Sequence, residues 1–140
     1  DAWQPAVMAV KAQGIECAYA EPKEGLRGWS IGISMVNGSP NEDAVMAYAD
    51  YWLSGPPAIA VSEQGYYSPT TTIKDHMSKE KYDFWYEGKP WVGAPDRGIQ
   101  EGDLRDGGSL ANRASKVSYW HQWPDEYDHL MMKWDEFLSA

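Results

Sequence analysis

The residues Gly28-Trp29-Ser30-Ile31-Gly32 fit the G-x-S-x-G pattern that carries the nucleophilic serine of many hydrolases. In those enzymes the serine stands on a sharp turn between a strand and a helix, where a histidine can take its proton. In this chain a turn precedes Ser30 and a period-two pattern continues past it. The sequence therefore favours a small strand residue at Ser30, and a serine hydrolase is kept as an alternative function.

A second group of residues has the spacing of a metal site. His121, Asp125 and His129 lie four residues apart, which would stack them on one face of a helix. Pro124 is expected to begin that helix and to leave His121 outside it. The single cysteine, Cys17, adds no cluster of thiol ligands. The sequence predicts solvated polar residues here, with no metal, no cofactor and no catalytic residue.

The aromatic residues are the third candidate, because the chain has eight Trp and nine Tyr but only two Phe. Four of them fall at junctions between expected elements, where binding sites concentrate: Trp3, Trp29, Tyr66 and Trp120. Each one alone is typical of an ordinary core aromatic. Together they favour an aromatic cage, which holds cations against the negative faces of the rings.

Helices and strands must position these residues. The period of the apolar residues predicts both kinds of element, and glycine and proline mark the ends of the helices. Ser39 is expected to cap one helix, with Pro40 in its first turn and Glu42 completing a capping box. The stretch 88–118 is rich in Gly, Pro and Asp and is expected to be mostly irregular. The expected helices cover 4–13, 39–55, 57–64, 78–87 and 124–138, and the expected strands cover 15–21 and 28–36.

Length and charge narrow the classes of function. A chain of 140 residues is about one domain. The net charge of −9, with scattered Lys and Arg, argues against a nucleic-acid partner. No window is apolar enough to span a membrane, and no signal peptide opens the chain. Because the chain begins at Asp1 without a methionine, we expect a processed product or a fragment.

Several of these residues also carry a resemblance to a known family. Trp3 is followed by Pro22-Lys23-Glu24-Gly25, by Trp29 and then by the helix expected at 39–55. Gly65-Tyr66-Tyr67-Ser68-Pro69 comes next, and an amphipathic helix ends the chain. This order resembles the C-terminal half of the spermidine/putrescine-binding proteins of bacterial ABC transporters, a branch of the periplasmic solute-binding proteins. The similarity covers Trp3 to Pro69 and resumes at Trp120.

The resemblance implies an α/β fold, namely the C-terminal portion of a two-lobed, type II periplasmic-binding-protein fold. Residues 1–29 would belong to lobe two, 30–75 to lobe one and 76–140 to lobe two again. The protein would be a periplasmic solute-binding component and not an enzyme, with a small amine-containing solute and a membrane permease as partners. The implied ligand-binding residues are Trp3, Trp29, Tyr66, Trp120, His121 and Gln122.

The chain departs from the family pattern in two ways. The family has an aspartate two residues after the strand tryptophan, and Ile31 stands there in this chain. Since a buried ammonium group needs a counter-charge, we expect a solute with one cationic end, or a zwitterion, rather than a polyamine. The chain is also less than half as long as family members. We therefore expect a C-terminal fragment that binds weakly alone and self-associates, with a stand-alone protein-interaction module as a further alternative.

Overall fold

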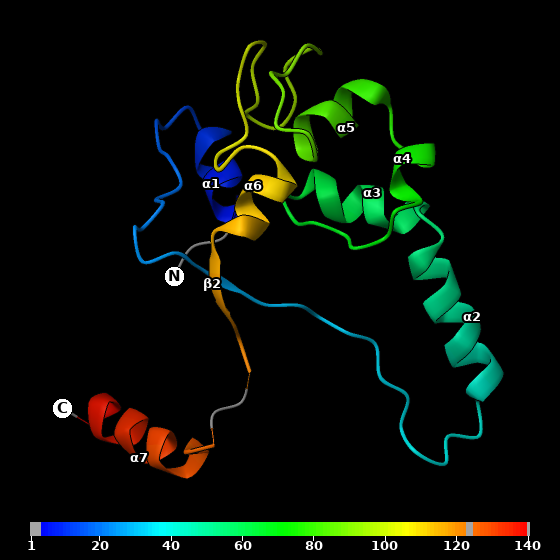
Figure 1. The fold of residues 1–140 in the computed structure, drawn as a ribbon, viewed down its shortest axis with the longest axis vertical. Helices are drawn as coiled ribbons and strands as arrows, with labels where there is room; N and C mark the ends of the chain where they lie inside the picture. The colour runs from blue at the N-terminus through cyan, green and yellow to red at the C-terminus, as the bar shows by residue number, and fades with distance from the viewer. Residues whose placement is uncertain (1–3, 123–124, 140) are drawn as a thin grey trace.

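The computed structural model describes residues 4–122 and 125–139. They form a mixed α/β arrangement of seven helices and a small parallel sheet of two strands (Figure 1). The elements in chain order are α1 (Gln4–Lys11), β1 (Leu26–Gly28), α2 (Glu42–Leu53), α3 (Pro56–Glu63), α4 (Ile73–His76), α5 (Lys79–Trp85), α6 (Leu110–Ser115), β2 (Val117–Trp120) and α7 (Tyr127–Leu138).

The sheet joins two segments that lie far apart in the sequence. Leu26 is paired with Val117 and Gly28 with Trp120, with an irregularity after Leu26. Two further backbone hydrogen bonds extend the ladder, from the Leu26 amide to the Lys116 carbonyl at 2.7 Å and from the His121 amide to the Gly28 carbonyl at 2.6 Å. Because the strands are parallel, their carboxyl ends lie at the same edge of the sheet.

The hydrophobic core lies between α1, α3, α4, α5 and the loop that follows α5 (Figure 1). Phe84 on α5 is central, since its ring meets Trp85 and Trp91 edge to face at 5.0 and 5.6 Å between centroids. The indole of Trp91 donates to the Ala94 carbonyl, so its one polar atom is satisfied. The buried core residues are Met8, Ala58, Ile73, Met77, Phe84, Trp85, Tyr86, Trp91 and Ile99.

Arg105 is a buried cation beside this core, only 3% exposed. Its guanidinium donates to the Trp85 carbonyl at 3.0 Å and to the Gly65 carbonyl at 2.8 Å. It also stacks between two rings, 3.9 Å from the Tyr67 centroid and 4.7 Å from the Trp85 centroid. Burial lowers the pKa of Arg105 to about 10, which leaves the side chain charged at neutral pH. Arg105 therefore ties the end of α5 to the loop that follows α3.

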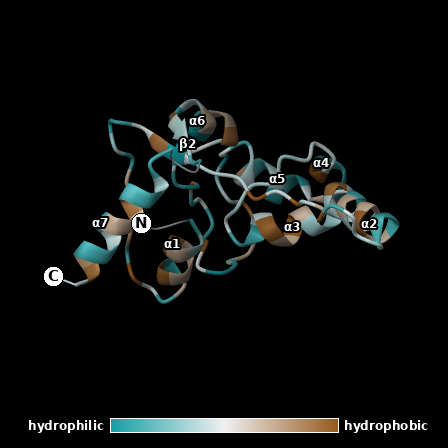
Figure 2. Ribbon diagram, turned by 90° about the horizontal axis from the view of Figure 1, so that it is seen from below, coloured by the Kyte–Doolittle hydropathy of each residue, from teal (hydrophilic) through white to brown (hydrophobic). Residues whose placement is uncertain are grey.

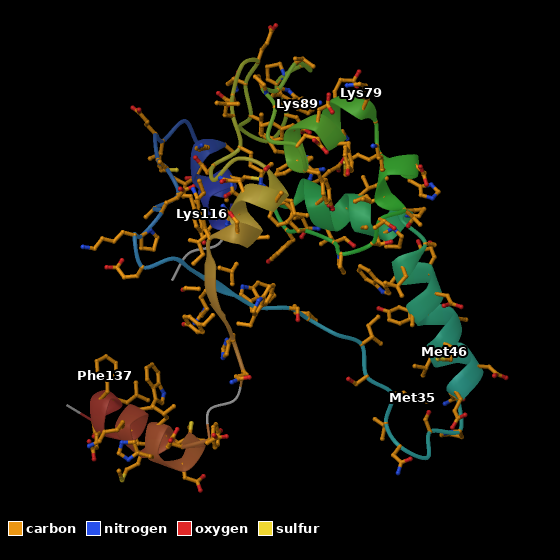
Figure 3. All side chains as sticks on the ribbon, in the orientation of Figure 1. Met35, Met46, Lys79, Lys89, Lys116 and Phe137 are labelled. Atoms are coloured by element: carbon orange, nitrogen blue, oxygen red, sulfur yellow. The ribbon has the colours of Figure 1, made fainter. Side chains whose placement is uncertain are left out.

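Three segments lie outside the compact part: residues 30–41, α2 and α7 (Figure 1). Neither α2 nor α7 contains a buried residue. Figure 2 shows hydrophobic residues of these two helices at opposite ends of the molecule, and Figure 3 labels Met35, Met46 and Phe137, all exposed, on the three segments. The chain exposes 10,141 Å², whereas a compact protein of 15.8 kDa exposes about 7,300 Å².

The expected helices are confirmed in type, as α1, α2, α3, α5 and α7, with ends shifted by a few residues. The capping box is wrong, because α2 begins at Glu42 with Asn41 at the cap position. Ser39 instead accepts a hydrogen bond from the Asn41 amide at 3.2 Å, within the turn before the helix. The irregular region expected at 88–118 holds α6 and the start of β2 near its end.

Both expected strands are wrong. Residues 15–21 are irregular, and of 28–36 only Gly28 belongs to a strand. The alternation of apolar and small residues suits a half-buried strand, but a strand also needs a neighbouring strand to bond with. Within the ranges that the structure describes, β1 pairs only with β2, and this pairing ends at Gly28. The division of the chain into lobes at residues 29 and 75 stays a prediction.

Candidate functional site

Most of the aromatic and polar residues predicted from the sequence come from the carboxyl end of the sheet. Trp29 directly follows β1, Trp120 ends β2, and His121 and Gln122 follow it. The hydrogen bond from the His121 amide to the Gly28 carbonyl holds the two strand ends together. Tyr66 comes from the loop after α3, and Trp3 lies outside the described residues. In open parallel sheets, ligands bind at this edge.

Trp29 and Tyr66 contact each other directly. Their ring centroids are 6.2 Å apart and their planes are at 80°, an edge-to-face arrangement. Both side chains are half-buried, so part of each ring stays accessible. Edge-to-face pairs are favourable because the positive edge of one ring meets the negative face of the other. Two of the predicted residues, 37 positions apart in this numbering, therefore form one aromatic wall.

Trp120 packs against β1, although its side chain is 62% exposed. A β-carbon built on Gly28 would lie 2.9 Å from Cε3 of Trp120 and 2.7 Å from Cγ1 of Val117. The indole thus covers the glycine that precedes Trp29. His121 and Gln122 are exposed beyond it. The pairing of Gly28 with Trp120 holds this end of β2 beside the strand end that Trp29 follows.

Replacing Gly28 by valine should open this edge of the sheet. The added side chain requires the space that Val117 and Trp120 occupy, so the strands must separate. We expect a loss of about 1–3 kcal/mol in the free energy of unfolding, measured by denaturant titration, together with a shift of tryptophan emission. Gly32→Val is the matched control, because nothing lies within 4 Å of a β-carbon at Gly32. An equal loss in both variants would contradict the packing described here.

Tyr66 also borders an open groove of about 260 Å³ between α1 and the end of α3. This volume is below the range of about 300–1,000 Å³ that is usual for drug-sized ligands, so the groove suits a small molecule. One wall is mostly apolar and comes from α1, and the other carries polar and charged groups. The lining residues are Pro5, Met8, Ala9, Ala12, Glu63, Gln64, Tyr66 and Arg97.

Two opposite charges meet at the polar wall. The Arg97 guanidinium donates to the Glu63 carboxylate at 3.1 Å and to the Glu63 backbone carbonyl at 3.0 Å. The other oxygen of that carboxylate accepts a hydrogen bond from Lys81. The Glu63 side chain is only 16% exposed, whereas Arg97 is 51% exposed. Among the described lining residues Glu63 is the single carboxylate, and it is already neutralised by two cations.

Arg97 is held in an unusual backbone conformation, with φ at 48°. It occupies a tight turn in which Asp96 and Ile99 exchange backbone hydrogen bonds of 3.0 and 2.8 Å. Gly98 follows with φ at 85°, so both central residues have positive φ, as in a type I′ turn. Glycine and asparagine suit such a position, and another side chain costs about 1–2 kcal/mol there. Glu63 and Arg97 are not marked by any pattern in the sequence except the turn-forming Asp96-Arg97-Gly98 run.

The serine of the G-x-S-x-G pattern lies in different surroundings from a nucleophile elbow. Ser30 is exposed and follows the end of β1, and between it and Glu42, a range that is fully described, no helix begins. Ile31, where the family resemblance would have an aspartate, is 85% exposed. The two histidines with the spacing of a metal site come from different elements. His121 follows β2 and His129 is on α7, so they do not share one face of a helix.

Comparisons with known proteins add no relative. No protein-family model matches the chain, and searches of curated proteins and of solved structures return no match. Among the helices of residues 4–122 and 125–139, none has the length and apolar character needed to cross a membrane. The geometry of the sheet edge and the groove is therefore the basis for a proposal about function.

Proposed function

We propose that this chain is part of the solute-binding component of an ABC importer, the C-terminal portion of a two-lobed protein of type II architecture. The observation that carries the proposal is the edge-to-face contact of Trp29 and Tyr66 at the carboxyl end of the parallel strands. The solute is a small amine-containing molecule, and no chemistry is performed on it. The location is the periplasm, and the partner is a membrane permease.

The physical basis is the attraction between a cation and the faces of aromatic rings. An ammonium group within about 6 Å of a ring centroid is stabilised by the ring quadrupole, more strongly as water is excluded. Trp29 and Tyr66 supply such faces in this chain. The family resemblance adds Trp3 and Trp120 as further aromatic contacts, with His121 or Gln122 as polar contacts that orient the solute.

The large exposed surface supports a chain that functions as part of a larger protein. The exposed area exceeds that of a compact protein of this mass by about 2,800 Å². Residues 30–41, α2 and α7 carry many exposed apolar side chains, and neither helix contains a buried residue. In a two-lobed protein the remaining parts of both lobes would cover these surfaces.

Removing either aromatic residue of the wall should weaken solute binding. We expect Trp29→Ala and Tyr66→Ala each to lower the affinity for putrescine by about tenfold, the loss of one stacking contact. The measurement is calorimetry or ligand-observed NMR at millimolar solute, since the proposed two-lobed protein would use contacts from both lobes and one part of it should bind weakly. Tyr51→Ala is the matched control, since Tyr51 is exposed on α2. Equal affinity in all four proteins would contradict the proposal.

The two alternatives make different predictions. A serine hydrolase would turn over simple esters and lose that turnover in Ser30→Ala. An interaction module would bind a protein partner through its exposed aromatic residues without binding small amines.

A further inference from the structure

The groove beside Tyr66 presents two opposite charges to a bound molecule. Glu63 and Arg97 lie on the same wall of the groove and form an ion pair with each other. A diamine entering it would find its single carboxylate already paired with Lys81 and Arg97. A molecule with both a carboxylate and an ammonium group can instead pair its carboxylate with Arg97 and its ammonium group with Glu63. The charge pattern of the groove thus matches a zwitterion better than a polyamine.

Arg97 has donors to offer such a molecule. One terminal nitrogen is fixed by the Glu63 backbone carbonyl, and the other contacts the Glu63 carboxylate. The third nitrogen of the guanidinium, Nε, makes only a long ion-pair contact of 3.7 Å to the Asp96 carboxylate. Half of the side chain is exposed. A solute carboxylate can therefore replace the Glu63 carboxylate at Nη2 of Arg97. The hydrogen bond from Nη1 to the Glu63 backbone carbonyl keeps the guanidinium in place.

The backbone around Arg97 is built to hold it at this position. A β-carbon on Gly98 would lie 2.5 Å from the Ala12 amide nitrogen, so the turn packs directly on the end of α1, which is the opposite wall of the groove. Arg97 itself keeps a left-handed conformation that asparagine or glycine would adopt with less strain. A positive-φ arginine on a groove wall is a strained position of the kind that clusters at ligand-binding sites.

We propose that Arg97 is a specificity residue that recognises the carboxylate of a zwitterionic, amino-acid-like solute, whose ammonium group lies between Glu63 and the Tyr66 ring. This inference rests on the proposed function, since it names the solute class for the same aromatic wall. Tyr66 connects the two, because it contacts Trp29 and also lines the groove. Glu63 then exchanges its pairing with Arg97 for the solute ammonium group and keeps Lys81 as its second partner.

Ornithine and putrescine test this assignment, since they share a diamine chain and differ by one carboxylate. Non-specific attraction to a chain of net charge −9 favours putrescine, the more cationic of the two. A preference for ornithine would therefore come from a specific contact. We expect ornithine to bind about tenfold more tightly than putrescine, measured for both by ligand-observed NMR titration at millimolar concentration.

Arg97→Asn is the informative variant, because asparagine suits the positive φ and keeps the turn folded. It should abolish the ornithine preference, because ornithine loses the partner of its carboxylate. Putrescine binding should be kept or become tighter, since the Glu63 carboxylate loses one of its two competing cations. Arg97→Lys should retain part of the preference, since it keeps the charge without the planar fork. Lys89→Asn is the matched control, because it removes an exposed positive charge on the loop after α5, outside the residues that line the groove.

The outcomes separate the two proposals. If putrescine binds as tightly as ornithine, or if Arg97→Asn keeps the preference, the assignment of Arg97 is overturned and the aromatic site remains. If neither molecule binds the unaltered chain, both proposals are overturned. If Tyr66→Ala weakens both molecules and Arg97→Asn weakens ornithine alone, both are supported.

Discussion

Replacing Arg105 by alanine should lower the free energy of unfolding by about 3–5 kcal/mol. The substitution leaves the carbonyls of Trp85 and Gly65 without the donor that now satisfies them. Each buried acceptor left unsatisfied costs about 1–3 kcal/mol. The Tyr67 and Trp85 rings also lose the group stacked between them. Since a domain of this size is stabilised by about 5–15 kcal/mol, this one change removes a large part of the stability.

Denaturant titration followed by circular dichroism measures this loss. Arg105→Met separates its causes, because methionine refills much of the volume but donates no hydrogen bond. We expect Arg105→Met to recover only the packing part and to remain less stable than the unaltered chain by about 2 kcal/mol or more. Lys89→Ala removes an exposed cation and should change stability by less than about 0.5 kcal/mol. An Arg105→Ala chain as stable as the Lys89→Ala control would show that the two carbonyls do not depend on Arg105.

The second large effect concerns association, since the isolated chain should form dimers or larger assemblies at micromolar concentration. An excess exposed area of about 2,800 Å² is more than three times the approximately 800 Å² that each partner contributes to a standard interface. One face of α7 is apolar and exposed, with Tyr127, Leu130, Met131, Trp134 and Leu138 at helical spacing. Sedimentation equilibrium measures the mass. A concentration range of roughly a hundredfold covers the transition from monomer to weak dimer.

Charged residues on that face should weaken association without unfolding the core. We expect Met131→Lys combined with Trp134→Lys to weaken self-association by at least about tenfold, because a buried ammonium group has no partner there. The circular dichroism melting temperature should stay unchanged, since α7 buries no residue within the chain. Glu136→Lys is the control on the opposite face of α7, and it should still associate. A strictly monomeric unaltered chain would refute the prediction.

The helices were predictable from the sequence because their signals are local. Apolar stripes, together with Gly14, Gly55 and Gly65 at or near the ends of helices, are enough to place α1, α2 and α3. The strands were not predictable, because period-two alternation says nothing about whether a partner strand is present. Residues 30–36 show this, since their pattern suits a strand and their side chains are exposed.

Some residues of the candidate site could be predicted from the sequence and others could not. Family resemblance named Trp29 and Tyr66, and the structure places them in contact. Glu63 and Arg97 could not be found from the sequence, because their pairing joins positions 34 apart through a turn whose geometry depends on packing against α1. The role of Arg105 cannot be read from the sequence for a similar reason, since its partners are backbone carbonyls, which every residue has.

The parallel pairing of β1 and β2 also sets an order of assembly. The Ser118 hydroxyl donates to the Leu26 carbonyl across 92 positions, and the whole core is formed by chain that lies between the two strands or before them. Closing so long a loop costs entropy that a three-residue ladder repays poorly, whereas α3, α4 and α5 meet through short connections. The core helices should therefore consolidate first and the sheet last. The binding residues at the sheet edge then belong to the part of the molecule that opens most readily, with amide protons that exchange before those of the core.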